Sequence, residues 1–452
     1  MRSTEDGPAP AGETSLRPAS SFGVALTGIA IAALAVRVGF TLVVDPQVPD
    51  VSDASAYHLL GRHLAEGRGY IRPFDLTLLG EVRPTAEYPP LLPALLALAG
   101  LLGIDTVDGQ QLVLSVVGTA TVVVVGLLGR HTGGPTVGLL AAGLAAVYPM
   151  LFQSDAILMP ETPFALLVAT SLLLAQRARE RPDALRFALA GGVVGLAALT
   201  RAEGLLLAPL LLVPLAVRAD VPSRRRRAGL ALVGLAATTL VVAPWTIRNA
   251  VRFDGALIPV SNNLGTALDG ANCDRTWSSS QTGLWLYDCF GGFDLRDQDE
   301  AQASAFHRDR GLRYVRDHLG RLPAVVAVRQ GRTFGVHDVD QQVVVESFEG
   351  RTERWQRIGT WTWWVLAPLA AGGAVVLIRR RQPVWVLVAP YLLVVATTAV
   401  TYGNQRFRVA AEPATVVLAA VAVGALTGVG RRTAPRSRTG ASGDRGAPAR
   451  AG

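Results

Sequence analysis

Long apolar stretches alternate with short polar segments along nearly the whole chain, from residue 22 to residue 427. About 20 consecutive apolar residues are enough for a helix to cross the hydrocarbon core of a membrane. The pattern therefore predicts ten spanning helices, at residues 22–44, 109–129, 135–152, 160–176, 184–200, 203–217, 228–248, 358–378, 383–401 and 409–427. The predicted fold class is an all-α polytopic membrane protein.

One further apolar stretch, residues 89–103, is too short to cross a core of roughly 30 Å comfortably. Counting it as a span would also invert the sidedness of every later arginine cluster. We predict that it forms an interfacial or re-entrant helix. The first stretch, residues 22–44, is longer than the apolar core of a usual signal peptide and has no clear small-x-small site near its end. We expect it to remain as an anchor.

Composition and charge agree with a membrane protein. Half of the residues are hydrophobic, and the mean hydropathy of +0.34 excludes a water-soluble domain of this size. The net charge is +8, the sequence contains no Lys, and many of the arginines cluster between the predicted spans or in the tail. Such clusters mark cytoplasmic loops rather than a nucleic-acid surface, so we expect no nucleic-acid partner.

The arginine clusters also predict the topology. With ten spans, the clusters at residues 177–186, 218–227, 379–381 and 431–432 all fall on the cytoplasmic side, together with both termini. We therefore expect a multi-pass plasma-membrane protein. The segments predicted to face outward are residues 45–108, 153–159, 251–357 and 402–408.

The predicted organisation has five parts. They are a disordered tail at 1–20, a membrane module at 21–250 with a first outer loop at 45–108, an extracytoplasmic insertion at 251–357, a three-span region at 358–430 and a second disordered tail at 431–452. The tails are rich in Pro, Gly, Ser, Ala and Arg and have no apolar period.

The insertion contains two expected helices and both cysteines. Residues 297–319 have an amphipathic pattern, and residues 322–336 suit a helix on the membrane surface. Cys273 and Cys289 lie in a segment expected to face an oxidising compartment, which favours a disulfide. Two free thiols are the alternative.

An acidic segment, residues 50–58, directly follows the first apolar stretch. A carboxylate at the outer edge of a multi-span protein is placed to act as a general base on a lipid-linked substrate. Asp53 is the main candidate and Asp50 competes with it; the alternative for Asp53 is a helix N-cap. Tyr57 follows Asp53 by one helical turn, so it either faces the same cavity or packs as an interfacial tyrosine.

Several segments match one known group in chain order. Residues 48–70, followed by Glu87-Tyr88-Pro89-Pro90-Leu91, resemble the first outer loop of GT-C glycosyltransferases. The nearest relatives are the protein O-mannosyltransferases, the aminoarabinose transferases and the Rgt-like lipopolysaccharide-core glycosyltransferases. The later matching segments are Met159-Pro160-Glu161-Thr162-Pro163-Phe164, Leu199-Thr200-Arg201-Ala202-Glu203-Gly204, Pro244-Trp245-Thr246-Ile247-Arg248-Asn249 and Gly270-Ala271-Asn272-Cys273. The resemblance covers residues 22 to about 290 well and the last three spans loosely.

The resemblance implies a GT-C architecture and a membrane glycosyltransferase. Such an enzyme moves a sugar from a polyprenyl-phosphate donor to a glycan, lipid or protein acceptor on the extracytoplasmic face, with inversion. In the group, an Asp of the first outer loop is the catalytic base, and Asp53 matches it. An acidic residue in the turn between the third and fourth spans lies beside that base. We favour Asp155 for this second catalytic position over Glu161, which is also an ordinary first-turn helix residue. The alternative for both acids is a solvated charge at the membrane boundary.

An anionic leaving group needs cations. Arg406 and Arg408 stand at an outer boundary, where positive charge is disfavoured, and a guanidinium suits a phosphate. Snorkelling to membrane lipid headgroups is the alternative. Arg201 and Arg248 also lie at outward span ends. Arg37, inside the first span, is expected to be ion-paired or to reach the cavity.

The remaining members of the predicted substrate-binding set are Tyr57, Glu87, Tyr88 and Glu161. By resemblance, Glu87 matches a position that helps bind zinc in some aminoarabinose transferases. No His-rich cluster accompanies it, so we predict no obligatory cofactor or metal, and a divalent metal has no other support.

Two other classes of protein share the hydrophobicity. A transporter or flippase for a lipid-linked sugar should have internal repeats and broken helices near the bilayer midplane, whereas here the polar signals lie at the outer rim. A non-catalytic assembly subunit would not need Asp53. A polyprenyl-phosphate phosphatase and a glycan-chain ligase are nearer enzymatic rivals.

Overall fold

The computed structural model describes residues 19–293 and 298–428. Within these ranges the regular elements are helices, and the one β pairing is an isolated antiparallel bridge between Ile71 and Pro84. Apart from Ala19 and Ser20, the predicted tails at 1–20 and 431–452 fall almost entirely outside the described residues. The structure thus has the all-α architecture that the apolar pattern predicts.

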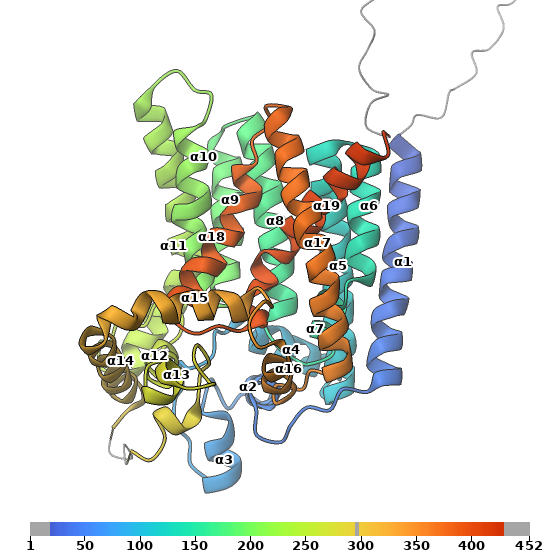
Figure 1. Ribbon diagram of the computed structural model, residues 1–452. Coiled ribbons are helices and arrows are strands. Elements are labelled where there is room, and N and C mark those ends of the chain that lie inside the picture. Colours follow the sequence, from blue (N-terminus) through green and yellow to red (C-terminus); the bar gives the residue numbers. More distant parts are fainter. Residues whose placement is uncertain (1–18, 294–297, 429–452) are drawn as a thin grey trace, which may run out of the picture.

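Roughly parallel helices form a bundle (Figure 1). Its members are α1 (Ala19–Val44), α5 (Val107–Gly133), α6 (Pro135–Val147), α8 (Glu161–Glu180), α9 (Ala184–Ala198), α11 (Arg224–Arg252), α17 (Glu353–Arg379), α18 (Trp385–Val400) and α19 (Glu412–Leu426). A short helix, α7 (Pro149–Asp155), follows α6 after a bend of 56°. Between α9 and α11 the chain forms η1 (Ala202–Leu206), η2 (Ala208–Leu212) and α10 (Val213–Val217).

Every predicted span contains helical residues, but these helices differ in length. Four are long and apolar enough to cross a membrane alone, namely Ser21–Val44, Val107–Gly133, Arg224–Arg252 and Glu353–Arg379. The bent pair α6 and α7 makes a fifth if it counts as one span. The predicted interfacial stretch at 89–103 forms only the short helix α4 (Leu91–Leu101). The described residues therefore contain at least four candidate spans.

Close backbone contacts hold the bundle together. Gly373 of α17 lies against Leu418 of α19, and Gly191 of α9 lies against Gly234 of α11; a Cβ at Gly373 or Gly191 would overlap the opposing carbonyl oxygen. Small residues allow this close approach. The resulting van der Waals contact holds helices together in lipid, where the hydrophobic effect contributes little to helix association. Side chains such as Phe164 complete the buried apolar core.

The short helices gather at one end of the bundle, the lower end in Figure 1. They are α2 (Asp53–Ala65), α3 (Pro73–Leu79), α4, α12 (Leu264–Ala271), α13 (Asp274–Ser278), α14 (Glu300–Asp317), α15 (Leu322–Thr333) and α16 (Val339–Ser347). Helices α14 and α15 occur where the sequence predicts an amphipathic and a surface helix, and α15 runs across the bundle end (Figure 1).

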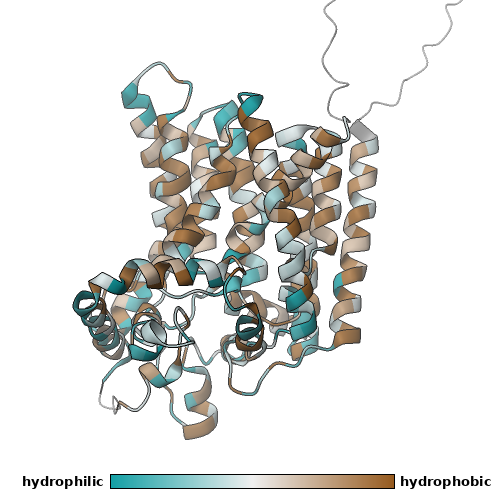
Figure 2. Cartoon of the chain, viewed as in Figure 1, coloured by the Kyte–Doolittle hydropathy of each residue, from teal (hydrophilic) through white to brown (hydrophobic). Residues whose placement is uncertain are grey.

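The opposite end carries connections between bundle helices. The start of α1, the end of α19 and the turn from α10 to α11 lie there (Figure 1), and Figure 2 shows hydrophilic residues on that turn. The predicted arginine cluster at 218–227 spans this turn. This arginine cluster thus lies at the same end of the bundle as the start of α1 and the end of α19.

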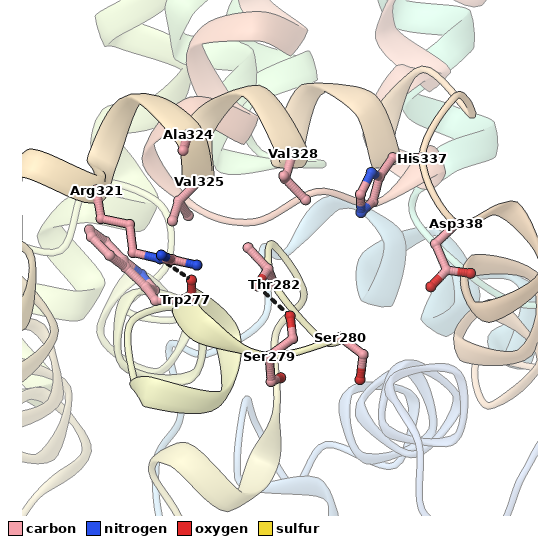
Figure 3. Close-up of a pocket in the computed structure, with 10 residues that line it drawn as sticks. All are labelled: Trp277, Ser279, Ser280, Thr282, Arg321, Ala324, Val325, Val328, His337 and Asp338. Atoms are coloured by element: carbon pink, nitrogen blue, oxygen red, sulfur yellow. Dashed lines mark hydrogen bonds between the residues drawn. The ribbon is translucent and has the colours of Figure 1, made fainter.

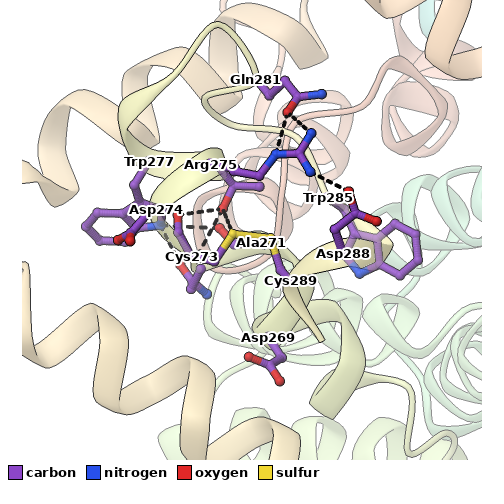
Figure 4. Close-up of a disulfide and its surroundings, with 12 residues drawn as sticks. Asp269, Ala271, Cys273, Asp274, Arg275, Trp277, Gln281, Trp285, Asp288 and Cys289 are labelled. Atoms are coloured by element: carbon purple, nitrogen blue, oxygen red, sulfur yellow. Dashed lines mark hydrogen bonds and ion pairs between the residues drawn. A yellow bond between two sulfur atoms is a disulfide. The ribbon is translucent and has the colours of Figure 1, made fainter. Parts of the chain in front are cut away.

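Cys273 and Cys289 form a disulfide that closes a loop containing α13 (Figure 4). Arg275, inside the loop, pairs with Asp288 and donates to the Gln281 side chain. The indole of Trp277 is fully buried and donates to the side chain of Asn272 at 2.9 Å. The loop is thus fixed by a covalent bond, an ion pair and a buried ring.

Candidate active site

Asp53 is the first residue of α2, and Ser52 is the residue that caps the helix. The Ser52 hydroxyl accepts a hydrogen bond from the Ser55 amide at 3.2 Å, and the Ser52 amide donates to the Ser55 hydroxyl at 2.9 Å. This reciprocal capping box satisfies the start of the helix. The N-cap interpretation of Asp53 is therefore wrong, and its carboxylate is free for other contacts. Asp50 is exposed.

Among the described residues, two side chains contact the Asp53 carboxylate, which is 37% exposed. The Tyr88 hydroxyl donates to Asp53 Oδ1 at 3.3 Å, and Arg406 Nη1 lies 3.7 Å from Oδ2. The buried Tyr57 ring packs edge-on against Tyr88, with ring centroids 5.0 Å apart. The structure thus brings Asp53, Tyr57, Tyr88 and Arg406 together.

Arg406, in η5 (Gln405–Ala410), connects Asp53 to a buried ion-pair network. Its Nε lies 2.8 Å from Glu161 Oε1, and its Nη1 lies 3.1 Å from Glu349 Oε1. The same Glu161 oxygen is 2.7 Å from Arg201 Nη1. Glu161, on α8, is fully buried. It therefore fixes two guanidiniums that come from distant parts of the chain.

The network contains more carboxylates than guanidiniums. Glu203 lies 2.6 Å from Arg201 Nε, so four carboxylates (Asp53, Glu161, Glu203, Glu349) share Arg201 and Arg406. Burial raises the pKa of Glu349 to about 7; Arg406 opposes this shift, and nearby carboxylates add to it. At Arg406, burial alone would lower the pKa, but the nearby Glu161, Glu349 and Asp53 outweigh it and raise the Arg406 pKa above its ordinary value. Arg406 therefore stays charged, while Glu349 titrates near neutrality.

Asp155 does not join this cluster. It ends α7, is buried, and lies 2.8 Å from Arg37 Nε of α1, while the Thr162 hydroxyl donates to it at 2.7 Å. Among the described residues, no hydrogen bond or ion pair links Asp155 to Asp53. The preference for Asp155 over Glu161 as the partner of Asp53 thus disagrees with the geometry. Arg37 was expected either to form an ion pair or to reach the cavity, and it forms the ion pair.

Arg408 also points elsewhere. It is fully buried, its Nε lies 2.6 Å from Glu412, and its Nη1 donates to the Thr333 carbonyl at 3.1 Å. Its guanidinium lies over the Trp363 ring, 4.2 Å from the centroid. These contacts occupy Arg408 in helix packing, so the expected phosphate contact has no support here.

Arg248 fastens the first outer loop to α11. Its guanidinium donates to the carbonyls of Thr85 and Tyr70 at 2.6 and 2.7 Å, and it lies over the Trp245 ring. The role of Arg248 in the structure is thus to position the loop that carries Tyr88. Of the four arginines predicted to bind substrate, Arg201 and Arg406 belong to the cluster.

Glu87 lines a cavity of about 280 Å³ next to the cluster. Burial raises the pKa of Glu87 to about 8, and the carboxylates of Glu300 and Asp53 add to the shift. Within residues 19–293 and 298–428, no group of three or more His, Cys, Asp or Glu side chains is arranged to hold a metal ion.

A second cavity, of about 360 Å³, lies between α15 and the loop after α13 (Figure 3). Ala324, Val325 and Val328 line one wall. Ser279 and Thr282 line the other. None of the predicted site residues lines this cavity.

Sequence reasoning missed Glu203 and Glu349 as members of the cluster. Glu203 lies two residues after Arg201 in one of the matched segments, so its position could have suggested it. Glu349 follows α16 in a loop of the insertion, and no pattern in the sequence distinguishes it from other acidic residues there.

Comparisons with known proteins bear on these observations. The family model for dolichyl-phosphate-mannose-protein mannosyltransferase matches residues 87–247. No curated protein matches the chain in sequence.

Solved structures extend the likeness to the fold. The archaeal oligosaccharyltransferase AglB from Archaeoglobus fulgidus, in complex with an inhibitory peptide and a dolichol-phosphate, has a TM-score of 0.54 at 15% identity over 94% of this chain and 53% of AglB. The apo form of the Archaeoglobus fulgidus oligosaccharyltransferase has a TM-score of 0.52 at 14% identity, over 90% of this chain and 51% of that one. ArnT from Cupriavidus metallidurans, bound to undecaprenyl phosphate, has a TM-score of 0.42 at 14% identity, over 90% and 79%.

The chain spans about half the length of the oligosaccharyltransferase structures that it matches. Identities this low establish a shared fold and leave the chemistry to the site. The family-model match covers the segment from Glu87 to residue 247, near the end of α11, and includes Glu161 and Arg201. The resemblance to GT-C glycosyltransferases is thereby confirmed, and the chain is a helical membrane protein with a GT-C-like fold.

Proposed function

We propose that the protein is a glycosyltransferase that moves a sugar from a polyprenyl-phosphate donor to an acceptor on the extracytoplasmic face of the plasma membrane. The observation that carries the proposal is the partly exposed Asp53 carboxylate, held beside the charged guanidinium of Arg406 at the end of a membrane bundle. A base next to a cation suits a reaction in which a hydroxyl loses a proton and a phosphate leaves.

The proposed reaction is a single displacement. The acceptor hydroxyl attacks the anomeric carbon, Asp53 takes its proton, and the bond between that carbon and the phosphate oxygen breaks. Attack opposite the leaving group inverts the anomeric carbon. A positioned general base contributes typically about 10²–10⁴-fold to such a step.

Arg406 is the proposed contact of the leaving phosphate. Its Nε and Nη1 are occupied by Glu161 and Glu349, whereas its Nη2 has no hydrogen-bond or ion-pair partner in the described part of the chain. A phosphate oxygen can therefore accept from Nη2 without breaking the contact to Glu161. Charge-assisted hydrogen bonds of this kind are about twice as strong as neutral ones.

Two further observations support the donor class and the orientation. AglB, which shares the fold, is bound to a dolichol-phosphate in its structure. The cluster lies at the bundle end opposite the turn that carries arginines 224–227. Since arginine-rich loops face the cytoplasm, this arrangement supports an outward-facing site and cytoplasmic termini.

The test is transfer of radiolabelled sugar from a panel of polyprenyl-phosphate sugars in membranes that contain the wild type, Asp53→Asn or Asp50→Asn. We expect Asp53→Asn to lower transfer by about 100-fold or more, because it removes the base. Asp50→Asn is the matched control, since Asp50 is an exposed carboxylate three residues away, and it should transfer at the wild-type rate.

Yield and gel-filtration profile in detergent show whether each variant is folded. Equal transfer by the wild type and a folded Asp53→Asn variant would refute the role of Asp53. No label from any donor in wild-type membranes would favour a transporter for a lipid-linked sugar or a non-catalytic assembly subunit.

A further inference from the structure

The cavity beside Glu87 lies between the first outer loop and the insertion. The first outer loop contributes Arg72, Phe74, Asp75, Glu87 and Tyr88 to its lining. The insertion contributes Asn262, Asn263, Thr266, Glu300, Ser304 and His307, among others. Its volume of about 280 Å³ is near the lower end of the roughly 300–1,000 Å³ that ligand pockets occupy, which suits one small ring-shaped group.

The charges of this wall disfavour an anion. Two carboxylates, Asp75 and Glu300, line the cavity with one guanidinium, that of Arg72, while the raised pKa of Glu87, about 8, leaves its carboxyl group uncharged at neutral pH. Arg72 is shared, since its Nη1 lies 3.6 Å from Asp75 and its Nε lies 3.4 Å from Glu300. A phosphate would meet more negative than positive charge here, so the cavity does not suit the phosphate of the donor.

The polar groups of the wall suit several hydroxyls at once. In the described part of the chain the Glu87 side chain has no hydrogen-bond or ion-pair partner, although it lines the cavity. Because burial raises its pKa to about 8, Glu87 is protonated at neutral pH and can both donate and accept. The Asn263 amide has the same capacity on the insertion side. Phe74 adds an aromatic ring.

Tyr88 links the cavity to the candidate base. The residue lines the cavity, and its hydroxyl donates to Asp53 at 3.3 Å. The Asp53 carboxylate is close enough to contribute to the raised pKa of Glu87. A hydroxyl-bearing molecule bound against Glu87 and Tyr88 would therefore lie close to the Asp53 carboxylate.

We propose that this cavity binds the acceptor, and that the acceptor is an uncharged sugar that presents one hydroxyl to Asp53; this inference rests on the proposed function. A sugar ring offers several hydroxyls to a compact wall of carboxyl, amide and hydroxyl groups. A peptide offers one side-chain hydroxyl and needs a longer groove for its backbone.

The experiment measures binding of methyl glycosides to the full-length protein in detergent by saturation-transfer NMR. The panel is the methyl glycosides of glucose, galactose, mannose, arabinose and N-acetylglucosamine, with glucose 1-phosphate and an acetylated serine amide for comparison. We expect saturable binding of at least one glycoside. Glu87→Leu, which removes the polar group but keeps an apolar side chain of similar size, should weaken it at least tenfold.

Three further variants complete the design. Glu87→Gln keeps donor and acceptor capacity and should restore most of the binding. Asn263→Ala, on the insertion side, should weaken binding independently. Glu66→Gln is the matched control, because Glu66 is an exposed carboxylate of the same loop that pairs with Arg62 and Arg68 away from the cavity, and it should bind as the wild type does.

The inference is overturned if the wild type binds no uncharged glycoside, or if Glu87→Leu and Asn263→Ala bind as tightly as the wild type. Binding of glucose 1-phosphate or the serine amide that is at least as tight, and equally dependent on Glu87, also overturns it. Sugar transfer whose acceptor KM is unchanged in Glu87→Leu would refute the cavity assignment while the proposed function stands. Absence of transfer from every donor would refute the proposed function, whatever the cavity binds.

Discussion

Replacement of Glu161 by glutamine should destabilise the protein strongly. Glu161 is fully buried, and one of its oxygens lies 2.7 Å from Arg201 and 2.8 Å from Arg406. Removing one partner of a buried ion pair costs about 3–5 kcal/mol, because the other charge stays buried without compensation. Since Arg201 keeps Glu203 and Arg406 keeps Glu349, we expect Glu161→Gln to cost about 3 kcal/mol, the lower end of that range.

Glu66→Gln is the matched control. Glu66 also contacts two guanidiniums, those of Arg62 and Arg68, each at 2.9 Å, but it lies in solvent. Exposed pairs contribute little, so this variant should unfold as the wild type does. The assay is the free energy of unfolding in detergent micelles titrated with dodecyl sulfate, followed by tryptophan fluorescence. Equal losses in the two variants, or no loss in Glu161→Gln, would refute the assignment of Glu161 as the centre of a buried network.

Two predictions concern other members of the site and the bundle. Glu349 competes with a phosphate for Arg406 only when Glu349 is ionised, so the affinity for the donor should fall several-fold as pH rises through about 7. Glu349→Gln should remove this pH dependence. The assay is the donor KM of both proteins on either side of that pH. Arg408→Met alone should cost about 3–5 kcal/mol of unfolding free energy, whereas Arg408→Met with Glu412→Leu should recover most of it, because the buried pair then disappears as a whole. A double variant no more stable than the single one would contradict the second expectation.

The positions of the helices followed from the hydrophobic pattern. Apolar stretches predicted helices at all ten places, and residues 89–103, predicted to form an interfacial or re-entrant helix, contain the short helix α4. Helix length alone does not show whether α18 and α19 cross a membrane, because they have 16 and 15 residues and a span needs about 20. Their packing against neighbours depends on tertiary contacts that no local pattern records.

The site was predictable only in part. Asp53 was predicted because a carboxylate follows the first apolar stretch at its outer edge, and Arg406 because positive charge is disfavoured at an outer boundary. The structure places the two side chains next to each other. Asp155 ends α7 and Glu161 begins α8 six residues later, and no sequence pattern shows that Arg37 pairs with Asp155 while Arg201 and Arg406 pair with Glu161. The assignment of Arg408 missed a simple signal, since Glu412 follows it by four residues.

The contact of Arg248 with the first outer loop has a consequence for how this protein can vary. Its guanidinium binds the carbonyls of Tyr70 and Thr85, and the chain pairs with itself between them through the bridge of Ile71 and Pro84. The excursion between these points is therefore closed at its base, as in an Ω-loop. Insertions or deletions at its tip, near the exposed Leu79, can accumulate without displacing Tyr88. The residues at the tip can thus be exchanged, in evolution or by engineering, while Tyr88 keeps its position beside Asp53.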